Sequence, residues 1–277
     1  MVDPAEGLTV REPAAACLAP RRFLQQTGAV RRLHLLLGFL LLSTLAACSG
    51  SPGPGPQPLT PTDSKGWGAI SLNGVETRVR WSDGDSFKFK DGPHEGSGVR
   101  LVGFNTLESY GPVHRWGKWT AEELYSIAAS SKDYAASRVW NCSTSGDKDG
   151  YGRLLVDCPD AAEALILAGH AHAFSMEGES SPDLQRAQQK AQRTGRGIWK
   201  KGVPDLVVTS LHSAAEGKGD RKGYNRRVNA SSGAPMVRNH TENYKVCQEV
   251  CEGGSSGSCL VYVPYAQRYR SKPDCLK

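Results

Sequence analysis

Short runs of alternating apolar and polar residues begin near Gly68 and predict a β-rich domain. They have the period of two that is typical of strands with one buried face. The acidic, glycine-containing link between the first two runs is typical of a tight turn, so Asp83 and Asp85 are expected at the tip or shoulder of a hairpin. The predicted strands are 77–81, 86–90, 99–103, 139–142 and 154–158.

Three helices are expected between and after these strands. Thr120 and Asp160 are each followed three residues later by a glutamate, which is the pattern of a capping box at a helix start. Ser181 precedes a proline, which is typical of a third helix start, and Gly169 and Gly195 are typical of helix ends. Five strands with helices after the third and the fifth predict an α+β fold, an OB-like β-barrel.

An export signal is predicted before this domain. Two arginines precede the apolar run 33–42, which is too short to cross a hydrocarbon core of about 30 Å. The run ends in Leu-Ala-Ala-Cys48, which resembles the lipobox of bacterial lipoproteins and predicts lipid attachment at Cys48. A cleaved soluble signal or a buried core helix is the alternative. The segment before residue 31 is long for a signal, and Val30 is an alternative start.

A tether is predicted after Cys48. Residues 49–64 are rich in proline, glycine and serine and have almost nothing to bury. Ser49 after the cysteine is similar to lipoproteins that are sorted to the outer membrane. We therefore expect an exported protein that is held at the bacterial outer membrane by its lipid anchor.

Five motifs between residues 77 and 199 together resemble the thermonuclease, or staphylococcal nuclease-like, family. Each motif is common alone, but the five in the family's order are specific. The resemblance implies a five-stranded OB-like barrel with about three helices, and hydrolysis of phosphodiester bonds in DNA or RNA with little sequence preference. The motifs are Asp83-Gly-Asp85-Ser, the stretch from Arg100 to Glu108, Tyr151-Gly-Arg153, Gly169-His-Ala-His172 and Gly197-Ile-Trp199.

The chemistry of phosphodiester hydrolysis explains the catalytic residues that this resemblance implies. Charge builds on the phosphate oxygens during attack, so the site must supply cations and a base. Arg100 and Arg153 have planar guanidinium groups that can each bind two phosphate oxygens. Glu108 is expected to orient or deprotonate the attacking water.

A calcium site is implied by the same motifs. Asp85, the side chain of Asn105 and the backbone carbonyl of Thr106 offer the oxygen ligands that Ca²⁺ prefers. Asp83 is expected to hold water around the ion. Asn105 stands where the family usually has aspartate, and the lost negative charge is expected to lower the metal affinity.

Several histidines and tryptophans have no assigned role. Residues 109–119 have no counterpart in the family, and His114, Trp116 and Trp119 could stack on bases, although packing against the barrel is the favoured interpretation. His170 and His172 lack a cysteine or carboxylate at matching spacing, so they are interpreted as ordinary barrel or rim residues.

Six cysteines remain when Cys17 and Cys48 of the export region are set aside, and an even number in an exported chain predicts disulfides. Cys142 and Cys158 are equidistant from Gly150, so a hairpin would place them opposite one another. We predict that their disulfide closes the base of the loop that carries Arg153.

The other four cysteines lie in the C-terminal region, and their three possible pairings stay open. A zinc site is a less favoured alternative, because their spacing departs from the usual zinc motifs. These cysteines are Cys247, Cys251, Cys259 and Cys275.

The C-terminal region is expected to be a small, disulfide-braced appendage of unknown role, because it lies beyond the motifs of the family. Residues 202–211 are apolar, and residues 214–227 are charged and predicted to be loop-like. The predicted organisation is an export signal (1–47), the lipidated cysteine and linker (48–66), the nuclease domain (67–202) and the C-terminal region (203–277). A monomer is expected.

The net charge of +6 changes this picture little. Removal of the export region leaves about +4, because it contains five arginines and three carboxylates. Mild basicity suits a polyanionic substrate such as nucleic acid.

Two functions are therefore expected from the sequence, in this order. The first is an exported, calcium-assisted endonuclease, favoured by the joint presence of Asp85, Arg100, Glu108 and Arg153. The alternative is a surface lipoprotein whose barrel binds nucleic acid or another polymer without cutting it, favoured by Asn105.

Overall fold

The structure, a computed structural model, describes residues 66–217, 222–268 and 275. The chain divides into two compact units, Met1–Ser51 and Pro52–Lys277, and all described residues belong to the second. The predicted export signal, Cys48 and nearly all of the linker lie outside the described residues. Within the described ranges, no helix is long and apolar enough to cross a membrane.

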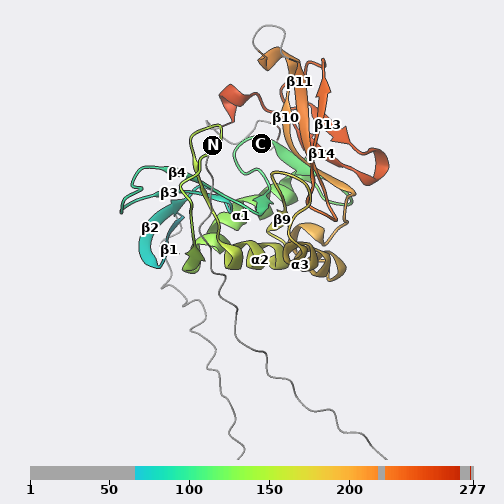
Figure 1. Ribbon diagram of the computed structural model, residues 1–277. Helices are drawn as coiled ribbons and strands as arrows, with labels where there is room; N and C mark the ends of the chain where they lie inside the picture. The colour runs from blue at the N-terminus through green and yellow to red at the C-terminus, as the bar shows by residue number, and fades with distance from the viewer. Residues whose placement is uncertain (1–65, 218–221, 269–274, 276–277) are drawn as a thin grey trace, which may run out of the picture. The chain divides into compact units, whose positions relative to one another are not determined.

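A curled six-stranded sheet forms the barrel (Figure 1), in the order β7-β1-β2-β3-β4-β8. The central pairs are antiparallel and the two edge strands are added in parallel. An isolated bridge between Ser143 and Asp157 links the two edges. The OB-like fold is confirmed, with one more strand in the sheet than the five predicted. The strands are β1 (Trp67–Leu72), β2 (Val75–Trp81), β3 (Ser86–Phe89), β4 (Gly98–Leu101), β7 (Trp140–Cys142) and β8 (Leu154–Val156).

The barrel closes around aromatic side chains because β2 and β3 alternate. Trp81, Phe87 and Phe89 are buried, and the Trp81 and Phe87 rings meet edge to face at 4.9 Å between centroids. Such edge-to-face pairs add to the stability from burial alone. Arg80 and Lys88, which alternate with these buried residues along the two strands, are exposed on the outer face.

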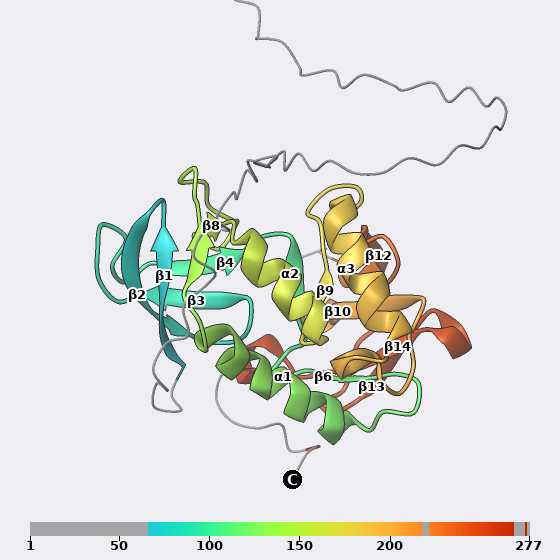
Figure 2. The same ribbon diagram turned by 90° about the horizontal axis from the view of Figure 1, so that it is seen from below.

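Three helices pack beside the sheet, and Figure 2 shows α2 and α3 side by side. Thr120 and Glu123 form the predicted capping box at the start of the first helix. Ser181 caps the third helix through the backbone N–H of Leu184. The helices are α1 (Ala121–Ala136), α2 (Pro159–Ala168) and α3 (Pro182–Arg193).

The predicted capping box at Asp160 is wrong. Helix α2 begins at Pro159, two residues earlier than an N-cap at Asp160 implies, and its N-cap is Cys158, which makes no side-chain capping bond. Proline suits the first helical position because it lacks an N–H and its φ is already helical. The predicted end at Gly169 is confirmed, since this residue is left-handed with φ 74°.

The C-terminal region adds two three-stranded sheets, and one of them takes in a strand from the predicted nuclease segment. Strand β6 pairs antiparallel with β14, and Leu260 lies opposite His114. The strands outside the barrel are β5 (Phe104–Thr106), β6 (Val113–Arg115), β9 (Ala171–Ala173), β10 (Leu206–His212), β11 (Gly223–Asn229), β12 (Pro235–His240), β13 (Glu249–Glu252) and β14 (Ser258–Val261). The short 3₁₀ helices are η1 (Gly197–Trp199), η2 (Ala214–Glu216), η3 (Gly254–Ser256) and η4 (Tyr265–Gln267).

The loop-like assignment of residues 214–227 is wrong for its second half. Strand β11 begins at Gly223 and pairs with both β10 and β12. Its buried face carries Asn225, which is fully buried and hydrogen-bonded. A polar residue on the buried face hides the apolar alternation that identifies a strand.

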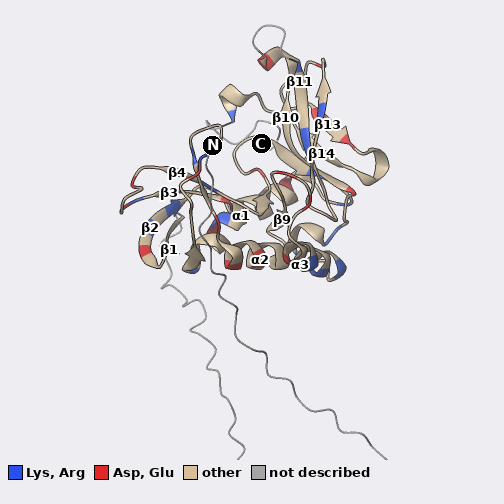
Figure 3. Ribbon diagram, in the orientation of Figure 1, with Lys and Arg blue, Asp and Glu red and all other residues tan. Residues whose placement is uncertain are grey.

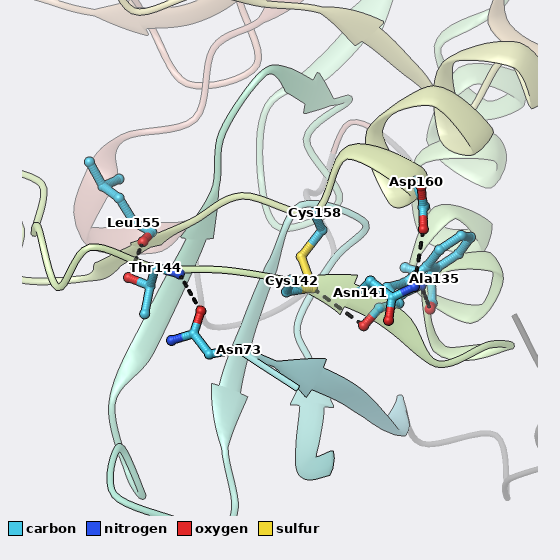
Figure 4. The surroundings of a disulfide bond; sticks show 9 residues. Asn73, Ala135, Asn141, Cys142, Thr144, Leu155, Cys158 and Asp160 are labelled. Carbon is cyan, nitrogen blue, oxygen red and sulfur yellow. Dashed lines mark hydrogen bonds between the residues drawn. A yellow bond between two sulfur atoms is a disulfide. The ribbon is translucent and has the colours of Figure 1, made fainter. Parts of the chain in front are cut away.

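The described cysteines form three disulfides. The predicted Cys142–Cys158 bond is confirmed, and Figure 4 shows it beside the Thr144 hydroxyl, which donates to the Leu155 carbonyl at 2.7 Å. The C-terminal pairs, which the sequence left open, are Cys247–Cys275 and Cys251–Cys259. No sulfur of these four is left for the zinc alternative, although Glu249, Cys251 and Cys259 lie close together.

The tryptophans between β6 and α1 are buried. Trp116 donates to the Gly202 carbonyl at 3.1 Å and Trp119 to the Ile198 carbonyl at 2.8 Å. Both belong to an apolar cluster with Leu124 of α1 and Trp199 of η1. Packing, the favoured interpretation, is confirmed, although the cluster is separate from the barrel core.

Candidate active site

The turn between β2 and β3 carries the two predicted acidic residues. The Ser82 N–H donates to the Ser86 carbonyl at 2.9 Å, which closes the turn as predicted. Gly84 is required there, because a Cβ at this position would lie 2.6 Å from the Thr106 side chain and 2.9 Å from that of Ser131. The turn is therefore pressed against β5 and α1.

Asp85 is buried and surrounded by donors. Its Oδ1 forms an ion pair with Arg100 at 2.6 Å and accepts from the Ser86 hydroxyl at 2.9 Å. Its Oδ2 accepts from the backbone N–H of Thr106 at 2.7 Å. Burial by itself would raise the pKa of Asp85, but Arg100 and the Thr106 N–H hold it below its ordinary value.

The pKa of Asp83 is shifted in the opposite direction. Burial and the neighbouring Asp85 raise its pKa well above the ordinary value, although Arg100 opposes them. Its Oδ1 accepts from the backbone N–H of Asp85 at 3.1 Å. The pair therefore favours one negative charge over two, as closely spaced carboxylates do.

Arg100 joins the barrel to the predicted metal ligands. Its guanidinium, which pairs with Asp85, also donates to the Asn105 side-chain oxygen. The Asn105 amide donates to the Thr106 carbonyl at 3.0 Å, so both further ligand oxygens already accept hydrogen bonds. The structure thus brings Asp85, Arg100, Asn105 and Thr106 into one cluster.

Strand β9 lies against this cluster. Asn105 faces His172 across the β5–β9 pair, and its amide nitrogen lies 3.4 Å from His172 Nε2. Burial lowers the pKa of His172 to about 4. His170, by contrast, lies against the Tyr134 ring, 4.7 Å between centroids.

Glu108 follows the cluster along the chain and is partly buried. Burial and then Asp85 raise the pKa of its carboxyl, and three arginines, Arg268, Arg100 and Arg153, act in the opposite direction. A raised pKa brings a carboxylate closer to the range in which it can exchange protons with water at neutral pH.

Arg153 reaches the site from the loop between β7 and β8. Its Nε donates to Asp149 at 2.7 Å, and its guanidinium lies 5.6 Å from the Tyr151 ring centroid. Among the described residues, its terminal amino groups have no hydrogen-bond partner, whereas Arg100 is already paired. The terminal amino groups of Arg153 are therefore not used in any hydrogen bond or ion pair of the described residues.

Sequence reasoning does not predict the roles of two residues that act on Glu108. His114 of β6 is buried, and its Nε2 accepts from the backbone N–H of Glu108 at 3.1 Å. Burial and the charge of His172 lower the pKa of His114 to about 3. This acceptor role requires a neutral ring, which the lowered pKa supplies.

Arg268 is the second residue whose role at Glu108 the sequence does not predict. It is buried, and it donates to the carbonyls of Leu211 at 2.7 Å and Val263 at 3.0 Å. Gly111, three residues after Glu108, has φ 126°. It has no room for a side chain, because a Cβ there would lie 3.0–3.1 Å from Arg268. Its only signal in the sequence is the set of tyrosines and arginines in residues 262–270.

The cluster can be compared with what a calcium ion requires. Asp85, Asn105 and Thr106 offer three oxygens of the kind Ca²⁺ accepts. Only one of these ligands is charged, and the described residues contain no group of three close carboxylates here. These three oxygens fit a hard divalent ion. Arg100 would have to release the side-chain oxygen of Asn105 before that oxygen could bind the ion.

Comparison with known families agrees with the arrangement. Residues 98–201, which include Arg100, Glu108 and Arg153, match the family described as Staphylococcal nuclease homologue. This part of the chain is therefore similar to that family, whose fold is the OB barrel, and the similarity suggests nuclease activity. No curated protein matches the chain.

Proposed function

We propose that the protein is an exported, calcium-dependent endonuclease that hydrolyses phosphodiester bonds of DNA or RNA with little sequence preference. The observation that carries the proposal is the cluster in which Arg100 pairs with Asp85 and with Asn105, because Glu108 follows this cluster three residues further along the chain. Phosphodiester hydrolysis needs such a mixture of base and cations.

Each residue then has a defined part. The Glu108 carboxylate orients the attacking water and takes its proton. Arg153 binds the phosphate oxygens through its terminal amino groups, and Arg100 stabilises the charge that builds on them during attack. All of these contacts are to the sugar–phosphate backbone, so they carry no base information.

Asp85, Asn105 and Thr106 are the residues that would hold calcium. The ion would supply further positive charge at the phosphate. Arg100 holds Asp85 and Asn105 in place in the structure described. Asn105, in place of a carboxylate, predicts weaker calcium binding than in a site with two charged ligands.

The test is cleavage of single- and double-stranded DNA and RNA by the purified protein, with calcium or with a chelator. The matched variants are Glu108→Gln and Arg153→Ala, and Lys190→Ala, on the exposed face of α3, is the control. We expect calcium-dependent cleavage that both site variants lose and the control keeps.

The second candidate function is a barrel that binds nucleic acid without cutting it. It is favoured by the pairing of Arg100 with both Asp85 and Asn105, which leaves less room for a metal. Binding without cleavage under every metal condition would establish this candidate in place of the enzyme.

The location is proposed on sequence grounds. A lipid on Cys48 would hold the protein at the bacterial outer membrane, and three disulfides are consistent with an oxidising compartment. A Cys48→Ser variant should leave the membrane fraction and lose the lipid mass. An unmodified Cys48 in the membrane-bound protein would refute the anchor. We expect the protein to be monomeric.

A further inference from the structure

A basic hollow lies on the outer face of β2 and β3, next to the turn that carries Asp83. Its volume is about 310 Å³, and Figure 3 shows Lys and Arg segments on β3 and beside α1. Four of its lining residues are cations and none is a carboxylate. The basic hollow is lined by Arg80, Trp81, Ser82, Lys88, Lys90, Tyr110 and Lys132.

No ion pair of the described residues involves the four cations of the basic hollow, although Lys90 lies 5.8 Å from the Trp67 ring centroid. Arg80 and Lys88 are directly opposite one another across the β2–β3 pair, and both are exposed. Like charges at such positions destabilise a sheet. None of the four cations forms an ion pair with a carboxylate of the described residues, whereas their neighbour Arg78 pairs with Asp91 at 2.7 Å. An anionic ligand would remove this repulsion.

A second, larger hollow has the opposite composition. It has a volume of about 670 Å³, lies along α2 and α3, and contains none of the predicted catalytic or metal-binding residues. Its lining has four carboxylates against two cations, so it offers no comparable attraction for a polyanion. These are Asp157, Asp160, Glu163, Asp183, Arg186 and Lys190.

Tyr110 connects the basic hollow to the candidate active site. It lies two residues after Glu108, lines the hollow, and its hydroxyl donates to the Ser82 carbonyl at 2.8 Å. Burial raises the pKa of Tyr110, the charge of Asp83 adds to this effect and that of Arg80 opposes it. The charges of both Asp83, in the acidic turn, and Arg80, in the basic hollow, therefore act on Tyr110.

We infer that the basic hollow is a binding subsite for backbone phosphates of the substrate strand that flank the bond to be cut. The inference rests on the proposed function, because it takes nucleic acid as the substrate. It adds that the protein binds an extended strand along one face of the barrel, from Arg153 past Tyr110 to Arg80 and Lys88.

The test measures binding rather than cleavage. The full chain carrying Glu108→Gln is mixed with a fluorescent dinucleotide or with a single-stranded DNA of about ten nucleotides, within the usual site size of such proteins. The variant Arg80→Ala/Lys88→Ala removes the opposed charges, and Arg80→Lys/Lys88→Arg keeps them. Lys190→Ala/Arg193→Ala removes two exposed cations of α3 as the matched control.

We expect the Kd of the ten-nucleotide strand to rise about tenfold in the alanine pair, and its salt dependence to weaken by roughly one unit of log–log slope. The dinucleotide has one internucleotide phosphate, which we expect at the candidate active site, so it should bind equally to all variants. The charge-keeping pair and the α3 pair should bind both ligands as the parent does.

Unchanged binding of the longer strand by the alanine pair would overturn the inference, and so would an equal loss for the dinucleotide. Thermal unfolding of each variant separates loss of the subsite from loss of fold. If the protein binds strands through the hollow but never cuts them, the proposed enzyme fails and the subsite stands.

Discussion

The barrel and the C-terminal region bury different kinds of side chain. The barrel core contains Trp81, Phe87, Phe89 and Trp140, and its polar site lies at one edge. The C-terminal region has a smaller apolar cluster and a buried polar network instead. Both regions nevertheless act on Glu108, the barrel through Arg100 and Arg153 and the C-terminal region through Arg268.

The polar network of the C-terminal region is centred on Glu252. Its carboxylate accepts from Asn225 at 2.7 Å and from Arg238 at 2.7 Å, and Arg227 lies 3.3 Å away. Asn225 also donates to the Tyr244 hydroxyl at 2.9 Å. Such a network stabilises a fold only when every member is paired, so it is more sensitive to single changes than an apolar core of equal size.

The comparison predicts that truncation in the barrel core has the largest effect. Phe87→Ala removes a fully buried ring and should lower the free energy of unfolding by about 3–5 kcal/mol. Urea unfolding, followed by tryptophan fluorescence, measures this change. Val75→Ala, at an exposed position of the adjacent strand, is the control and should unfold as the parent does. A loss below about 1 kcal/mol for Phe87→Ala would mean that the ring is not part of a packed core.

The next effect is expected from the disulfides. Cys251→Ser/Cys259→Ser should lower the free energy of unfolding by about 2–4 kcal/mol, because the open chain gains conformational entropy when it unfolds. The corresponding Cys142→Ser/Cys158→Ser variant should also lose activity, since that bond closes the loop of Arg153. Equal activity loss in both variants would contradict a local role for the Cys142–Cys158 bond.

Acid should destabilise the protein through two buried histidines. His114 and His172 have folded-state pKa values of about 3 and about 4, below the ordinary value of 6.5, so the unfolded state binds more protons below that pH. Stability is therefore present above about pH 6.5 and is lost on acidification, by about 2 kcal/mol per histidine at pH 5. The raised pKa values of Asp83 and Glu108 act in the opposite direction.

Unfolding free energies of the parent and of His172→Gln at both pH values measure this loss. The variant should show a smaller decrease between neutral pH and pH 5 than the parent. An identical decrease would place the acid sensitivity elsewhere.

Arg268 tests whether the C-terminal region belongs to the site. Its positive charge opposes the raised pKa of Glu108, so Arg268→Ala should raise that pKa further and move the acidic limb of the rate profile to higher pH. The rate below neutral pH should fall about tenfold. Arg268→Lys should restore the profile in part. A uniform loss of rate with no shift of the limb would indicate a structural role alone.

The smallest effect is expected at the exposed contact between β6 and β13. Arg115 and Glu249 form an ion pair there, and both side chains are well exposed to solvent. Arg115→Ala should change the free energy of unfolding by less than about 1 kcal/mol. A larger change would mean that this pair, rather than the β6–β14 ladder, joins the C-terminal region to β6.

How well the strands of the two regions can be predicted from the sequence depends on whether their buried side chains are apolar or polar. Alternation in β2 and β3 is visible in the sequence because the buried positions are apolar, and the Cys142–Cys158 bond follows from symmetry about one loop. Strand β11 is hidden because Asn225 occupies a buried position.

The acidic turn and the clustering of Arg100 with Asn105 follow motifs within one segment of the chain. Arg268 lies in a distant segment, and its charge acts on Glu108 through tertiary packing that no local pattern encodes. The same holds for His114, whose acceptor role depends on the pairing of β6 with β14. The sequence therefore predicts the site residues that belong to the barrel motifs. It does not predict the roles of Arg268 and His114, which depend on the C-terminal region.

The most direct test of the account is single-turnover cleavage of a short single-stranded DNA by the parent and by Glu108→Gln, in calcium and at several pH values. The account predicts a rate about 10²- to 10⁴-fold lower in the variant, with the acidic limb of the parent profile absent. Equal cleavage by both proteins would contradict it, because the nuclease activity would then not depend on Glu108.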